Sequence, residues 1–126
     1  MTTRTTLVSG ADAATREAAI RAAIDSDNAA PTAVILEGLA RGNDAFETCA
    51  TRSGLHIIRI APGCLCCAGN LTLTVHLNRI LRQRPARLYI SLANAEHIDR
   101  IEEFLKKPVY AKWLTLADRM SYVLVR

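Results

Sequence analysis

The sequence contains few aromatic residues, no long hydrophobic run and no strong excess of charge of one sign. Only 5% of its 126 residues are aromatic, and the formal net charge is +4, too small to indicate nucleic-acid binding by itself. No apolar run approaches the roughly 18 residues of a membrane-spanning helix. Met1–Gly10 also lacks the apolar core of a secretory signal. We therefore predict a cytoplasmic protein that neither spans a membrane nor binds nucleic acid.

Cysteine is scarce too, since four residues in a chain of this length exclude a scaffold held together by disulfides. Half of the chain is hydrophobic and 22% is charged, which excludes an intrinsically disordered protein. The length is that of one domain with one core. We predict a single domain over residues 1–126.

The chain alternates between strand-like and helix-like segments. Short β-branched and apolar runs predict strands at 5–9, 32–36, 56–61, 87–92 and 121–125. Helical periodicity and capping residues predict helices at 13–25, 44–52, 70–82 and 95–107, and residues 109–118 are compatible with a short helix carrying Trp113. This alternation is typical of a parallel sheet with helices on both faces, whose binding sites form at the carboxyl ends of the strands.

The first predicted helix has two local features. Asp12 or Thr15 is a candidate N-cap, because short polar side chains accept a hydrogen bond from the free N–H groups of the first turn. Glu17 and Arg21 are four residues apart, which predicts an ion pair on the outer face of this helix.

Three cysteines follow the third predicted strand within four residues. Cys64, Cys66 and Cys67 could supply three corners of a tetrahedral site for zinc or copper(I), ions that prefer thiolate ligands. Cys49 is a doubtful fourth ligand because it precedes this strand, and His76 could approach only if the next helix bends back. Two alternatives stay open, which are thiol redox chemistry and inert cysteines buried as small apolar groups.

The segment Ala61–Cys67 resembles the Gly-Cys-x-Cys-Cys segment of the CobW-like GTPases, the CobW/HypB/UreG group of metallochaperones. Val34–Glu37, Arg84–Ile90 and Ser121–Val125 resemble further segments of that family in the same order. The resemblance implies a P-loop-NTPase-like, three-layer α/β/α fold with a mostly parallel sheet of about five strands, the first lying between the fourth and fifth. It also implies that the three clustered cysteines bind metal.

The resemblance places the family's phosphate-binding loop on a segment that has lost its essential residues. Gly10 keeps the first glycine, whereas Thr15, Arg16 and Glu17 replace the second glycine, the phosphate-binding lysine and the magnesium-binding hydroxyl. Ser91–Asn94 stands where the family has Glu-Thr-Thr-Gly, and the chain ends before the guanine-reading segment and the family's C-terminal domain. We therefore predict a degenerate, non-functional nucleotide site without GTP hydrolysis.

These observations predict a truncated, non-catalytic CobW-like protein that binds zinc or copper(I) through its Cys-x-Cys-Cys segment. It would act in metal homeostasis or regulate a partner, such as a full-length CobW-like GTPase or a metal-recipient protein. An uncovered edge strand would favour self-association. A residual GTP-binding GTPase and a thiol-redox protein are the alternatives.

Four arginines surround the end of the helix predicted at 70–82, namely Arg79, Arg82, Arg84 and Arg87. Cations are favourable at a helix C-terminus, and no aromatic residue is interleaved with these four. We interpret them as a solvated basic face, and the alternative is a surface that binds nucleic acid or another anion.

Overall fold

The computed structural model describes residues 2–9, 13–26, 31–37, 55–60, 71–92, 96–116 and 120–121. The strands are β1 (Thr3–Ser9), β2 (Thr32–Glu37), β3 (Leu55–Ile60), β4 (Arg87–Ser91), β5 (Leu114–Leu116) and β6 (Met120–Ser121). The helices are α1 (Ala13–Ser26), α2 (Leu71–Arg82), α3 (Glu96–Leu105) and α4 (Pro108–Ala111).

These strands form one sheet in the order β3-β2-β4-β1-β5, and every pairing in it is parallel. β6 also pairs with β1, where Val8 lies opposite Met120, whereas β5 pairs with the start of β1, where Thr3 lies opposite Leu114. β1 therefore lies between β4 on one side and β5 with β6 on the other. This confirms the predicted parallel sheet with its first strand in the interior.

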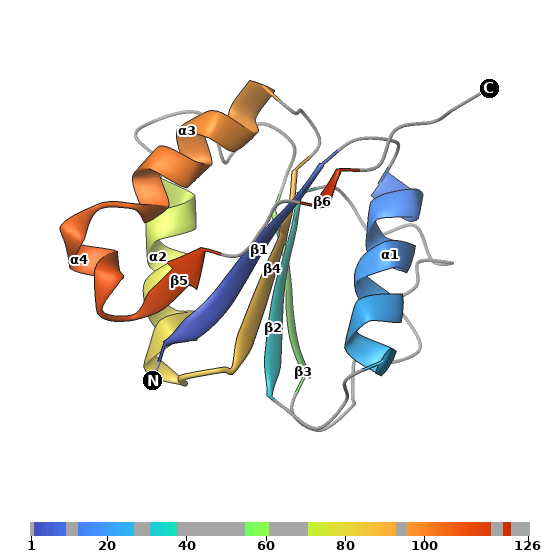
Figure 1. Ribbon diagram of the computed structural model, residues 1–126, viewed down its shortest axis with the longest axis horizontal. Coiled ribbons are helices and arrows are strands. Elements are labelled where there is room, and N and C mark those ends of the chain that lie inside the picture. The colour runs from blue at the N-terminus through green and yellow to red at the C-terminus, as the bar shows by residue number, and fades with distance from the viewer. Residues whose placement is uncertain are drawn as a thin grey trace.

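Helices cover both faces of the sheet (Figure 1). α1 covers one face, where Ile20 and Ile24 pack in a buried cluster with alternate residues of the strands, including Val8. α2, α3 and α4 cover the other face with a larger cluster that includes Leu7 and Leu77. Leu7 and Val8 are neighbours in β1 that point to opposite faces, as the pleat of a strand requires. The three-layer α/β/α architecture follows.

Most predicted elements agree with the structure to within two residues at each end, but the end of the chain differs. Residues 109–118 contain α4 and β5, and α4 ends at Ala111, so Trp113 is not helical. The strand expected at 121–125 overlaps β6 at Ser121, which pairs with β1, but pairing with β1 already begins at Leu114 in β5, a strand that the sequence analysis did not predict. Residues 122–125 and the helix predicted at 44–52 lie outside the described residues.

The start of α1 also corrects a prediction. Thr15 lies inside the helix, two residues after its first residue Ala13, so Thr15 is not the N-cap. The other candidate, Asp12, lies outside the described residues. In the part of the chain that the structure describes, no helix is long and apolar enough to cross a bilayer.

The packing of α2 can be tested with two residues of the same helix. Leu77 is fully buried and Val75 is about half exposed. We expect Leu77→Ala to lower the free energy of unfolding by about 2–5 kcal/mol, because it leaves a cavity under the helix. Val75→Ala is the matched control and should change it by less than about 0.5 kcal/mol. Urea unfolding followed by circular dichroism measures both, and equal effects would contradict the assigned orientation of α2.

Candidate functional site

Buried polar residues end three adjacent strands of the sheet. Ser9, Glu37 and Ser91 are the last residues of β1, β2 and β4, and all three are buried. The strands are parallel and in register, with Ser91 opposite both Val8 and Leu36. These residues therefore lie at one edge, which we call the carboxyl edge, the place where α/β sheets bind their ligands. The register places Ser91 on the same face as Val8 and Leu36, the face covered by α1, and Ser9 and Glu37 on the other.

Arg16 of α1 reaches this edge although it is almost completely buried, with 2% of its surface exposed. Its Nε donates a hydrogen bond to Oγ of Ser91, over 2.9 Å. A buried guanidinium needs such partners, because it has lost its hydration. Arg16 stands where the resemblance places the phosphate-binding lysine, and Ser91 stands where it places the acidic residue of the fourth strand. The two positions are joined here by a direct protein contact.

Glu17, the next residue of α1, is also only 2% exposed. Its two carboxylate oxygens accept hydrogen bonds from the two terminal nitrogens of Arg59, over 3.1 and 3.2 Å. This bidentate geometry is the strongest arrangement of an arginine with a carboxylate. Glu17 is therefore not on the outer face of α1. The prediction of an outward-facing ion pair between Glu17 and Arg21 was wrong, because Glu17 faces the sheet. Its partner comes from β3 instead.

The arrangement changes what the carboxyl edge can do chemically. The carboxylate of Glu17 lies where the resemblance places a magnesium-binding hydroxyl, and its charge is neutralised by Arg59. Glu37, buried at the end of β2, is not isolated either. The buried charges of Arg16 and Glu17 are therefore satisfied by other side chains of the protein, as buried charges must be.

Sequence analysis missed Arg59 as a member of this cluster. A signal was present, because Arg59 is the one arginine or lysine in the strand segment Leu55–Ile60, whose other residues are apolar except His56. A long cation in such a partly buried strand favours an acidic partner inside the protein. The identity of that partner depends on the packing of α1 against the sheet, which the sequence does not give.

The thiol residues of the predicted metal site, Cys64, Cys66 and Cys67, lie outside the described residues, as do Gly10 and Cys49. The flanking elements are described. β3 ends at Ile60, opposite Glu37 and hence at the carboxyl edge, and the cysteines follow in sequence before α2. No group of three potential metal ligands occurs within the described ranges. Nδ1 of His76 in α2 is buried and has no hydrogen-bond partner there.

The three-layer α/β/α fold with its parallel sheet is consistent with a P-loop-like fold. One curated protein resembles the chain further. It is 40% identical over 65 residues to the zinc chaperone YeiR of Escherichia coli strain K12. The match covers 51% of this chain but 20% of YeiR, so the chain spans about a fifth of that relative. No protein-family model and no solved structure matches the chain. The partial identity supports the resemblance to CobW-like metallochaperones.

The pair formed by Glu17 and Arg59 can be tested by removing one charge. Glu17→Gln keeps the shape but removes the carboxylate charge that accepts both hydrogen bonds from Arg59, so we expect a loss of about 1–3 kcal/mol in the free energy of unfolding. Glu103→Gln, at an exposed position of α3, is the control and should cost less than about 0.5 kcal/mol. Equal effects in urea unfolding would show that the pair does not stabilise the fold.

The same geometry leads to a prediction about nucleotides. Arg16 already donates to Ser91, and Glu17, which stands where the resemblance places a magnesium-binding hydroxyl, already accepts from Arg59. We expect GTP and ATP with Mg²⁺ to bind no tighter than about 1 mM, or about −4 kcal/mol. Isothermal titration calorimetry measures this, with an active GTPase as positive control. Micromolar affinity for either nucleotide would contradict the prediction.

Proposed function

We propose that this chain is a non-catalytic, CobW-like protein that carries a thiophilic metal ion, zinc or copper(I), as its cargo. The observation that carries the proposal is the combination of two facts. The sequence has a Gly-Cys-x-Cys-Cys segment at Gly63–Cys67, and the chain is 40% identical over 65 residues to a zinc chaperone. Neither fact requires nucleotide chemistry.

The donor set suits such a cargo. Cys64, Cys66 and Cys67 offer three soft thiolate ligands, which select zinc or copper(I) over hard cations such as magnesium. Three thiolates leave the fourth position of a tetrahedral ion open. An open position allows an incoming ligand of a recipient to bind before the carrier's ligands leave, and this suits a carrier better than a closed structural site.

The non-catalytic part of the proposal is supported by the carboxyl edge. Arg16 and Glu17 are buried and bonded to Ser91 and Arg59, so these two side chains serve the fold. A hydroxyl at position 91 lacks the charge with which an acidic residue organises magnesium and water. The proposed activity is therefore metal binding and handover in a reducing, cytoplasmic environment, where thiols stay free.

The partner in this proposal is either a metal-recipient protein or a full-length CobW-like GTPase that this chain regulates. Both fit a carrier without nucleotide chemistry of its own, because transfer between thiolate sites needs only ligand exchange. A metal-transfer assay with purified candidates distinguishes them, since a recipient gains the ion whereas a regulated GTPase changes its rate of hydrolysis.

The metal proposal predicts the behaviour of single cysteine variants. We expect one Zn²⁺ or Cu⁺ per chain, and Cys→Ser at position 64, 66 or 67 should weaken binding at least about tenfold, because two thiolates remain. Binding should release protons and weaken as the pH falls toward about 6, since only thiolates are ligands. The domain should stay folded without metal, because its core is the packed sheet. Competition against a chromogenic chelator under reducing conditions measures the affinity.

Two further variants serve as controls. Cys49→Ser should change the affinity little, because Cys49 precedes β3 whereas the three ligands follow it. His76→Ala should also change little if the fourth position is open, and a large loss would instead identify His76 as the fourth ligand. If the triple variant lacking Cys64, Cys66 and Cys67 bound metal as well as the natural chain, the proposed function would be wrong.

A further inference from the structure

Two adjoining hollows lie at the amino ends of the strands, away from the carboxyl edge. The first has a volume of about 170 Å³ between α2 and α4 and is lined by Asn78, Leu81, Arg82, Val109, Tyr110 and Trp113. The second, of about 560 Å³, lies beside the starts of β1, β2 and β4, and Arg84, Pro85 and Lys112 are among its lining residues. Leu81 and Trp113 line both hollows, so we treat them as one surface and call it the amino-edge groove.

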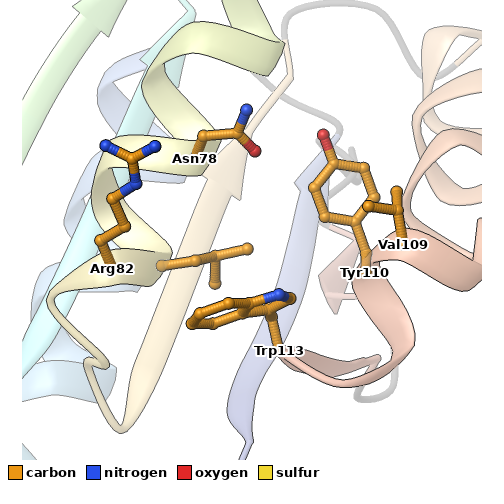
Figure 2. A pocket seen from close by; sticks show the side chains of 6 residues that line it. Asn78, Arg82, Val109, Tyr110 and Trp113 are labelled. Carbon is orange, nitrogen blue, oxygen red and sulfur yellow. The ribbon is translucent and has the colours of Figure 1, made fainter.

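The groove exposes apolar side chains that would otherwise be expected in a core. Val109 is 65% exposed and Trp113 is 38% exposed. Figure 2 shows the hydroxyl of Tyr110 and the amide of Asn78 pointing toward each other at one end of the first hollow, with Trp113 at the other. An apolar wall with a few polar groups is typical of a surface that receives an apolar side chain. Tryptophan, tyrosine and arginine are also the residues most enriched among energetically dominant contacts at interfaces.

The charge of the groove has one sign. Arg82, Arg84 and Lys112 line it, whereas its described lining residues include no aspartate or glutamate. None of the three cations forms an ion pair within the described part of the chain. Burial raises the pKa of Tyr110, against a smaller opposite effect of its hydrogen bond with Thr74, so its phenol remains neutral at physiological pH. The groove is therefore complementary to carboxylates.

Arg84 is held in place by the backbone as well as by its side chain. Its φ of 51° lies in the left-handed region, at a position after α2 where glycine is usual. Its N–H donates to the carbonyl of Leu81 over 3.0 Å, and its guanidinium lies 5.7 Å from the centre of the Trp113 ring. Left-handed backbone is unfavourable for a residue with a Cβ. The chain thus presents a cation beside Trp113 at a local conformational cost.

This arrangement changes the interpretation of the basic residues around α2. Sequence analysis assigned them to a solvated face because no aromatic residue lies among them. The fold brings Trp113 to Arg84 from almost thirty positions further along the chain. Because the Arg84 guanidinium lies over the Trp113 ring, that face of the indole is not open to a stacked base, which disfavours single-stranded nucleic acid.

We propose that the amino-edge groove binds an acidic peptide segment of a partner protein. An apolar side chain of the segment would lie against Val109 and Trp113, and its carboxylates would pair with Arg82, Arg84 and Lys112. The partner's chemistry follows from charge complementarity and from the exposed apolar wall. The proposal is independent of metal binding, because the groove lies at the amino ends of β1, β2 and β4, whereas the cysteine segment follows β3 in the sequence and contributes no lining residue.

The groove has its own spectroscopic reporter, because Trp113 is the only tryptophan of the chain. We would select a phage-displayed library of random short peptides against the full chain without added metal. We expect the enriched peptides to carry aspartate or glutamate around a leucine, phenylalanine or tryptophan. A synthetic copy of an enriched peptide that lacks tryptophan should shift the fluorescence emission of Trp113 on binding. The affinity of this peptide should fall with rising salt concentration, since screening weakens exposed ion pairs.

Charge reversal provides the decisive comparison. The double variant Arg82→Glu and Lys112→Glu should weaken binding of the synthetic peptide at least about tenfold. Arg100→Glu, with the same type of charge change at an exposed position of α3 that lines neither hollow, should alter it less than about twofold. Circular dichroism checks that both variants fold.

Other outcomes would overturn the proposal. These are enrichment of neutral or basic peptides, no enrichment at all, unchanged Trp113 emission, or equal binding by both variants. Oligothymidine displacing the peptide with higher affinity would indicate nucleic acid, and Trp113 emission that depends on protein concentration alone would indicate a second copy of the chain. Metal binding by the cysteine variants is measured separately from peptide binding at the groove. Failure of the proposed metal-carrier function can therefore be distinguished from failure of the proposed peptide site.

Discussion

The burial of β1, β2 and β4 on both faces is the constraint on which the rest of the structure depends. Each of these strands has a neighbour on either side and helices on at least one face (Figure 1), and the buried clusters on the two faces meet their alternate side chains. The polar residues buried in these strands are threonines, serines and Glu37, so no acidic or basic side chain is buried in the middle of the sheet. Charged chemistry is therefore confined to the two ends of the strands, and the chain uses these ends differently.

At the carboxyl edge, this chain differs from a phosphate-binding loop in the groups that form hydrogen bonds with its buried charges. A phosphate-binding loop leaves backbone N–H groups and a lysine unsatisfied until an anion arrives. Here Arg16 donates to Ser91, and Glu17 accepts from Arg59, so side chains of the protein satisfy one another. A buried pair of this kind is costly to break, because either partner alone is left as an uncompensated charge. An incoming phosphate would have to compete with contacts that already hold α1 to the sheet.

The sequence was sufficient to predict the alternation of elements and the parallel sheet, because these depend on local hydrophobic patterns, whereas the position of β1 came from the family resemblance. It was not sufficient for β5, since three residues such as Leu114–Leu116 become a strand only because β1 offers a hydrogen-bonding partner. The partner of Glu17 was missed for a similar reason. Arg21 is near along the helix, but Arg59 is near in space, and a buried carboxylate selects the partner that shares its burial. The metal ligands remain a prediction, which rests on the spacing of the cysteines and on the family resemblance that they carry.

The two ends of the sheet also differ in how their charges are balanced. At the carboxyl edge the carboxylate of Glu17 is paired with Arg59, so these two charges neutralise each other inside the protein. The amino-edge groove gathers cations of one sign around Trp113, with no carboxylate among its described lining residues. Uncompensated charge beside exposed apolar surface gains little from the fold itself, and a side chain held in an unfavourable backbone conformation, as Arg84 is, adds to the cost. Such an arrangement is stabilised most by a ligand that supplies both the missing carboxylates and an apolar side chain, and this makes the amino edge the end of the sheet suited to a partner.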